Sequence, residues 1–219
     1  MKPEPSSFPG AAAGTDRPLA YHHGDLRRAL VEAALALATE EQRWDFSLRE
    51  VARRAGVSHN APYRHFSEKR DLLAAVAVAG FDALRARLAA AAEETEEPEA
   101  ALVATGVAYI GFGTENPARY RLMFGPALFV AGAEMPSTVA QAGAAAKAVL
   151  ARIIACGVRA KRFAVSADTQ AEQEGFVLTA WSLVHGLTML LIDGRAGDAV
   201  PSSLPETVAR ILLDGIRKR

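Results

Sequence analysis

The sequence predicts an all-α protein with a small three-helix unit near its N-terminus and a larger helical domain after it. From Gly24 onward, apolar residues recur every three or four positions, which is the period of a helix. No segment shows the polar-apolar alternation of a strand, and Gly and Pro separate the periodic segments. We expect a flexible tail over residues 1–20, a helix-turn-helix domain over 21–70 and a C-terminal domain over 71–219.

The composition is that of an ordinary globular protein. The 219 residues carry 25 Lys+Arg and 25 Asp+Glu, and half of them are hydrophobic, so the chain can bury a core unaided. The single cysteine, Cys156, excludes an internal disulfide, and no Cys or His cluster has zinc spacing. The N-terminus lacks a signal peptide's apolar core, and no unbroken apolar run approaches about 18 residues. We expect a cytoplasmic protein without metal or cofactor.

Charge is unevenly distributed along the chain. Residues 17–70 contain 10 basic and 7 acidic residues, a net of +3, whereas residues 71–219 contain 14 and 16, a net of −2. Four of the five histidines also lie between residues 17 and 70. This excess is modest for a nucleic-acid-binding segment and is also compatible with a solvated helical surface.

Each helix of the N-terminal unit has a recognisable start or stop. The first follows Asp25, and the second follows Ser47, which forms a capping box with Glu50. Gly56 suits the C-terminus of the second helix because glycine takes positive φ readily. A third short helix, capped by Ser58, is expected to run to about Phe66. This order of helix, glycine turn and helix is typical of a helix-turn-helix motif.

The remaining chain is predicted to form longer helices. Ser67 is expected to cap a helix that continues to about Ala92, just before an acidic link that ends at Pro98. Glycines and prolines then separate five further expected helices, over residues 99–114, 118–124, 137–160, 170–193 and 204–217.

Three sequence blocks between Tyr21 and Leu73 carry a family resemblance. They are Tyr-His-His-Gly from Tyr21, Phe-Ser-Leu-Arg-Glu-Val-Ala-Arg-Arg-Ala-Gly-Val-Ser from Phe46, and Tyr-Arg-His-Phe-Ser-Glu-Lys-Arg-Asp-Leu-Leu from Tyr63. Together they resemble the N-terminal domain of TetR-type transcriptional regulators. In the C-terminal part, Trp181, His185 and Gly186 resemble the Trp/His-Gly (WHG) subgroup of that family.

The start of the third expected helix supplies candidates for reading DNA bases. A helix that begins at Ser58 would present its first side chains to the major groove. Asn60 can pair with adenine, and His59 can donate to guanine. Ala61 or Pro62 can pack on a thymine methyl group. Pro62 departs from the residue type common at this position in the family, and it restricts where the helix can begin because it lacks an amide hydrogen.

A second set of side chains is suited to the DNA backbone. Tyr63, His65, Lys69 and Ser47 carry polar groups that match phosphate oxygens, and the resemblance implies the same role. Arg49 can reach either a base or a phosphate. His22 and His23 can contact a phosphate, cap the first helix or lie on an ordinary surface. Phe66 is expected in the core and Tyr63 on the surface.

The C-terminal part contains candidates for ligand binding and for dimerisation. Its aromatic residues at helical spacing can simply form a core, but the resemblance implies an apolar pocket for a small effector, with His185 and Tyr109 as polar anchors. From the residues alone, His185 is more typical of a hydrogen-bonded core histidine. The ligand candidates are Tyr109, Phe112, Tyr120, Met123, Phe124, Phe129, Trp181, His185 and Met189. The candidates for a two-fold four-helix interface, which the resemblance implies, are Phe176, Leu183, Leu187, Leu190, Val208, Leu212 and Ile216.

These observations favour a homodimeric regulator that binds a DNA operator and is released by a small apolar or amphipathic effector. Activation instead of repression stays open. One alternative is a ligand-binding or interaction module that no longer uses its helix-turn-helix on DNA, which the modest charge and Pro62 allow. Another is an enzyme, but Ser182, His185 and Cys156 are not accompanied by a nucleophile elbow, a phosphate loop or a metal motif.

Overall fold

The expected all-α architecture is confirmed. The computed structural model describes residues 23–41, 43–128, 134–164, 170–197 and 199–216, and every regular element in these ranges is helical. In chain order the elements are α1 (His23–Glu41), α2 (Leu48–Arg54), the 3-10 helix η1 (Pro62–Arg64), α3 (Lys69–Glu93), α4 (Pro98–Glu115), α5 (Pro117–Phe124), α6 (Ser137–Arg159), α7 (Gln170–Ile192) and α8 (Leu204–Ile216). The tail expected over residues 1–20 lies outside the described residues.

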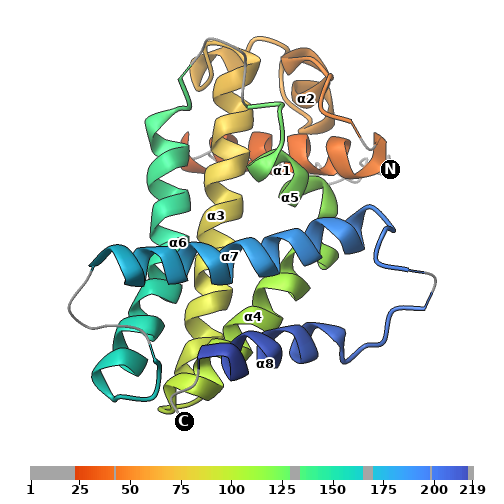
Figure 1. The fold of residues 1–219 in the computed structure, drawn as a ribbon. Helices are drawn as coiled ribbons and strands as arrows, with labels where there is room; N and C mark the ends of the chain where they lie inside the picture. Colours follow the sequence, from red (N-terminus) through yellow and green to blue (C-terminus); the bar gives the residue numbers. More distant parts are fainter. Residues whose placement is uncertain (1–22, 42, 129–133, 165–169, 198, 217–219) are drawn as a thin grey trace, which may run out of the picture.

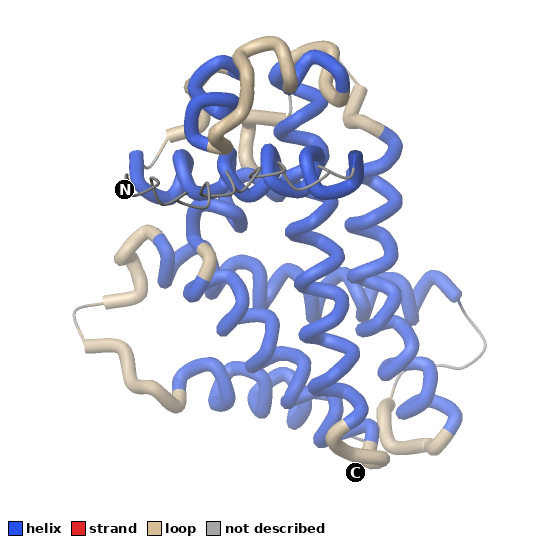
Figure 2. The backbone as a smooth tube through the Cα atoms, turned by 180° about the vertical axis from the view of Figure 1, so that it is seen from behind, coloured by secondary structure: helices blue, strands red, loops and turns tan. Residues whose placement is uncertain are grey.

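The helices form one bundle organised around α3. Figure 1 shows α1 and α2 together at one end of the molecule, and α3 runs from that end to the opposite one. α4 and α8 lie at the far end, α6 runs beside α3, and α7 crosses both. The reverse view in Figure 2 shows the same helical arrangement from behind. A continuous core joins the two ends, from Leu30 on α1 to Leu213 on α8.

Three predicted helix starts are wrong. The first helix, α1, begins at His23, so Asp25 lies within its first turn instead of preceding the helix. The segment after Ser58 forms only the 3-10 helix η1, whose N-cap is Ala61. Pro62 cannot donate a backbone hydrogen bond, so regular winding begins at this residue and the chain before it forms a turn, with the Ala61 amide donating to the Ser58 carbonyl at 2.9 Å. The N-cap of α3 is Glu68 instead of Ser67.

Asp71 explains why α3 starts after Glu68. Its Oδ2 accepts hydrogen bonds from the amides of Ser67, at 3.0 Å, and Glu68, at 3.2 Å. The backbone of Ser67 therefore lies outside the helix, and the side chain of Asp71 satisfies amides that have no helical partner.

Two helices are long and apolar enough to cross a membrane by length and composition alone, namely α6 and α7. Many of their apolar residues are alanine or glycine, which explains why the chain shows no long run of large apolar side chains. Both helices pack into the bundle, with Val149 and Ile154 of α6 and Val184 of α7 buried. In this fold they are core helices of the C-terminal part.

Candidate functional site

The helix-turn-helix is held by local backbone contacts that the sequence predicts correctly. The capping box at the start of α2 is confirmed: Ser47 Oγ accepts from the Glu50 amide at 3.2 Å, and the Ser47 amide donates to Glu50 Oε2 at 2.6 Å. These bonds satisfy amides at the helix N-terminus. The bond from the Ser47 amide also lowers the pKa of the Glu50 carboxyl.

The turn after α2 is a Schellman motif. Gly56 has φ of 68° and donates its amide to the Arg53 carbonyl, and the Val57 amide donates to the Ala52 carbonyl at 3.0 Å. A side chain at Gly56 would have open space but a strained backbone. The turn therefore needs glycine for its conformation, and it sets the direction in which the chain leaves α2.

The segment from Ser58 to Phe66 presents polar groups on one side and apolar groups on the other. Ser58, His59, Asn60 and Tyr63 are exposed, whereas Phe66 is buried as expected. Tyr63 has an exposed fraction of 51%, which is unusual for an aromatic residue and needs an explanation. Its phenol is available to a partner outside the chain.

Four other candidates differ in how accessible they are. Pro62 is buried, so it packs inside the N-terminal unit and is not available to a thymine methyl group, contrary to expectation. Ala61 and His65 are half-buried, and His65 Nε2 has no partner among the described residues. Lys69 is also half-buried, with Nζ 5.3 Å from the centre of the Phe46 ring, and burial lowers its pKa.

Arginines give this end of the molecule unpaired positive charge. Arg49 and Arg64 are exposed, and the described part of the chain offers neither of them an ion-pair partner. Arg54, in contrast, is bound by Glu40, with Nη1 2.6 Å from Oε2. Arg64 was not among the residues predicted to contact DNA. It directly follows the candidate Tyr63 in the sequence, and this position could have identified it.

Two further candidates for phosphate contacts are the histidines at the start of the described chain. His22 lies outside the described residues, and His23 is the first residue of α1. Their proposed phosphate contacts therefore stay predictions.

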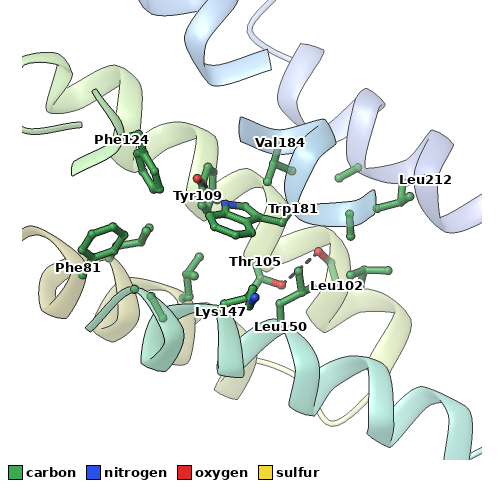
Figure 3. A pocket seen from close by; sticks show the side chains of 17 residues that line it. Phe81, Leu102, Thr105, Tyr109, Phe124, Lys147, Leu150, Trp181, Val184 and Leu212 are labelled. Atoms are coloured by element: carbon green, nitrogen blue, oxygen red, sulfur yellow. Dashed lines mark hydrogen bonds between the residues drawn. The ribbon is translucent and has the colours of Figure 1, made fainter. Parts of the chain in front are cut away.

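The C-terminal part contains an apolar pocket, lined by residues of the six helices from α3 to α8 (Figure 3). The cavity inside it measures about 50 Å³. Trp181 and Tyr109 lie close together at its centre in Figure 3, with Phe81 and Phe124 at one end and Leu212 at the other. Ligand sites for drug-sized molecules usually measure about 300–1,000 Å³, so the cavity in this structure is smaller than such a ligand needs.

The structure brings only some of the predicted ligand residues to the pocket. Tyr109, Phe124 and Trp181 line it. The predicted residues that do not line it are Phe112, Tyr120, Met123, His185 and Met189. Phe129 lies outside the described residues.

Most of the pocket wall was missed by the sequence analysis. It consists mostly of small and aliphatic side chains on five helices, which follow the same spacing as ordinary core residues. The missed residues are Phe81, Leu84, Leu88, Leu102, Thr105, Gly106, Gly143, Ala146, Lys147, Leu150, Ala180, Val184 and Ala209. Leu212, expected at a dimer interface, also lines the pocket.

A hydrogen-bonded cluster of aromatic side chains adjoins the pocket, and two of its members, Tyr109 and Trp181, line the pocket wall. Trp181 Nε1 donates to the Tyr109 hydroxyl at 2.9 Å, and the two tyrosine hydroxyls of Tyr109 and Tyr120 lie 3.0 Å apart. The Tyr120 hydroxyl is 2.7 Å from His185 Nδ1. Burial raises the pKa of Tyr109 to about 12, raises that of Tyr120 and lowers that of His185. Burial therefore favours the neutral form of all three side chains.

One exposed face of α7 and α8 has no partner within the described chain. Leu178, Leu183 and Leu190 on α7 and Ile211 on α8 are exposed, and the exposed fraction of Ile211 reaches 65%. Of the predicted interface residues, Leu183 and Leu190 belong to this face. Phe176, Leu187, Val208 and Ile216 are half-buried instead.

The described residues contain no group of three or more His, Cys, Asp or Glu side chains that could hold a metal ion. The polar helix-turn-helix surface, the apolar pocket and the exposed face of α7 and α8 are features that can act on other molecules.

Comparison with known proteins identifies the class of protein that these features define. Residues 30–76 match the N-terminal domain of bacterial regulatory proteins of the tetR family, and residues 102–215 match the tetracyclin repressor-like C-terminal domain. The chain therefore belongs to the TetR family of transcription regulators, as the sequence resemblance indicated. An uncharacterised helix-turn-helix-type transcriptional regulator of Haemophilus influenzae is 51% identical over 47 residues, which is 21% of this chain and only 23% of that relative.

Solved structures share this fold over most of the chain. A protein of unknown function from Rhodococcus sp. RHA1 is 30% identical, with a TM-score of 0.78, over 91% of this chain and 100% of that chain. A TetR family transcription regulator from Marinobacter aquaeolei is 17% identical, with a TM-score of 0.65, over 89% and 96%. A fatty acid degradation regulator from Bacillus halodurans is 17% identical, with a TM-score of 0.67, over 87% and 99%. The last two comparisons concern the fold alone.

Proposed function

We propose that this DNA-binding regulator is a cytoplasmic homodimeric repressor, released from its operator by a small apolar or amphipathic effector. In this proposal the helix-turn-helix up to residue 70 binds DNA, and residues 71–219 bind the effector and a second copy of the chain.

One observation carries the proposal: α3 belongs to both sites. Lys69, its first residue, contacts Phe46 in the helix-turn-helix, and Phe81 and Leu88 farther along the same helix line the pocket. A ligand larger than the present cavity must move side chains or helices apart. Because α3 is one continuous helix, such a movement changes the position of the DNA-binding end.

Exposed groups around η1 support the DNA contact. Asn60 and His59 are free to meet base edges, and Tyr63 and Arg64 are free to meet bases or phosphates. Phosphate contacts also make affinity fall steeply with salt concentration, because each one releases a counterion.

The exposed face of α7 and α8 supports a homodimer. Its apolar side chains are unfavourable in water unless they are covered. Gly186 on α7 has open space where a side chain would be, so contacts within the chain do not explain this glycine. A second copy packed by two-fold symmetry would cover the same face on both subunits and would present two DNA-binding ends to a pseudo-palindromic site.

Selection of binding sites from fragmented genomic DNA, at two salt concentrations, tests the DNA-binding proposal. The wild-type protein is expected to enrich a pseudo-palindromic sequence. A variant with Tyr63→Ala and Arg64→Ala should lose the enrichment. Arg85→Ala, which changes an exposed arginine on α3 outside the helix-turn-helix, should keep it. If folded dimeric protein enriches no sequence even at low salt, the protein does not act through DNA and the ligand-module alternative replaces the proposal.

Sedimentation of two variants tests the dimer. Leu183→Lys places a charge on the exposed face of α7 and should produce monomers. Val107→Lys changes an equally exposed apolar residue on α4 and should leave the dimer intact. A wild-type protein that sediments as a monomer contradicts the proposed interface.

A further inference from the structure

The polar groups in the wall of the pocket are almost all engaged within the protein. The Thr105 hydroxyl donates to backbone carbonyls of its own helix, including that of Leu102 at 3.2 Å. Trp181 Nε1 and the Tyr109 hydroxyl bond to each other, and Tyr109 also bonds to Tyr120. A ligand inside the pocket therefore meets hydrocarbon surface and few free donors.

Lys147 is the exception. It is the single charged residue among the 17 that line the pocket, and it is exposed, so it marks the place where the pocket meets solvent. Its Nζ lies 5.5 Å from the centre of the Trp181 ring. No carboxylate of the described residues forms an ion pair with it. The ammonium group is thus held near the pocket by the indole face, without an anion.

We propose that the pocket binds an amphipathic anion, namely a molecule with a hydrocarbon body and one terminal carboxylate that pairs with Lys147. The hydrocarbon body matches the apolar wall, and the carboxylate matches the Lys147 ammonium at its edge. When the anion binds, the Lys147 ammonium moves from the Trp181 ring to the carboxylate. This inference rests on the proposed function for its regulatory meaning, but binding itself does not require DNA.

Calorimetric titration without DNA tests the ligand class, with decanoate, 1-decanol and decyltrimethylammonium as probes of similar chain length. Wild-type protein is expected to bind decanoate about tenfold more tightly than decanol, which is the range of a charge-assisted contact, and to bind the cation most weakly. The preference should shrink between low and high salt because Lys147 is exposed.

A charge reversal at the same position separates the role of Lys147 from general hydrophobic binding. Lys147→Glu should abolish the preference for decanoate and favour the cationic probe. Arg152→Glu makes the same change at an exposed residue of α6 that does not line the pocket, and it should keep the wild-type order. Thermal melting of both variants checks that they fold.

The outcomes distinguish this inference from the proposed function. Equal affinity of the wild type for decanoate and decanol, a decanoate preference that survives Lys147→Glu, or no binding of decanoate at millimolar concentration would each overturn it. A decanoate preference that depends on Lys147, in a protein that selects no DNA, would support the ligand class and contradict the regulator. A protein that selects an operator but binds decanoate no more tightly than decanol would support the regulator and contradict the ligand class.

Discussion

The Tyr120 hydroxyl lies 2.7 Å from Nδ1 of His185, inside the C-terminal bundle. Tyr120 is fully buried on α5 and His185 is half-buried on α7, so this bond joins two helices that are distant in sequence. Nδ1 of a neutral histidine can accept a hydrogen bond from the hydroxyl, whereas Nδ1 of a protonated histidine can only donate one. The direction of this bond therefore depends on the protonation of His185, and burial favours the neutral form by lowering its pKa.

We predict that stability falls in mildly acidic solution because of His185. A histidine whose pKa is lowered by folding resists protonation in the folded state, while the unfolded chain takes up the proton near the ordinary pKa of about 6.5. Its contribution to stability is thus complete above about pH 6.5 and is lost as the pH falls below that value. Urea unfolding of wild type and His185→Gln at pH 5.0, 6.0 and 7.5 measures the effect.

The free energy of unfolding of the wild type should fall more between pH 7.5 and 5.0 than that of His185→Gln. Carboxyls with lowered pKa values, such as Glu40 and Glu115, lose their contributions only below their ordinary pKa, so they act at lower pH. Parallel pH profiles of the two proteins would show that His185 does not cause the loss.

Tyr120→Phe should lower the free energy of unfolding by about 1–3 kcal/mol. The substitution keeps the ring but removes two buried hydrogen bonds, one to His185 Nδ1 and one to the Tyr109 hydroxyl, and each contributes about 0.5–1.5 kcal/mol. Tyr63→Phe removes the hydroxyl of an exposed tyrosine and serves as the control, with an expected change below about 0.5 kcal/mol. Equal stability of the two variants would mean that the buried cluster contributes nothing.

Gly113→Ala should destabilise the protein by about 1–3 kcal/mol because α4 and α7 approach closely there. An added Cβ would lie 2.2 Å from Cγ2 of Thr188, which is fully buried, and 3.0 Å from the Tyr120 ring. At Gly175 the same substitution meets nothing within 4 Å, and alanine in a helix should stabilise by about 0.5–1 kcal/mol. Thermal melting compares the two variants; a stable Gly113→Ala protein would contradict the close approach.

Ser47→Ala should destabilise the helix-turn-helix by about 1 kcal/mol, since Ser47 caps α2 through its side chain. Ser58→Ala should have a smaller effect, below about 0.5 kcal/mol, because Ser58 is exposed and its carbonyl, which the substitution keeps, makes the contact with Ala61. Chemical denaturation of both variants makes the comparison. A larger loss of unfolding free energy for Ser58→Ala than for Ser47→Ala would mean that the Ser58 side chain caps a helix after all.

Features set by neighbouring residues could be predicted from the sequence. The capping box of Ser47 and Glu50 and the glycine turn at Gly56 depend on contacts within a few positions, so their patterns are visible in the chain. The extent of the third helix could not be predicted in the same way. Pro62 both delays the winding and is buried, and its burial follows from the packing of the folded chain, which local spacing does not show.

The pocket could be predicted only in part because core, pocket and interface residues share one spacing on a helix. Leu212 illustrates this: its periodic position on α8 indicated an interface, yet the structure places it in the pocket wall. Lys147 illustrates the opposite case, since an isolated lysine on an alanine-rich helix gives no signal until Trp181 is seen beside it. Only the packing of α6 against α7 reveals that pair.

Because α3 is one unbroken helix, a small tilt at the pocket produces a larger displacement at its N-terminal end. Its 25 residues span about 37 Å, and Lys69 lies about 18 Å along the helix axis from Phe81 in the pocket wall. A tilt of about 5° pivoting at Phe81 would displace Lys69 by about 1.5 Å, and a symmetric pair of subunits would double the change in separation. If an effector widens the pocket as proposed, α3 would carry that movement to the DNA-binding end and change its match to the fixed repeat of the DNA helix.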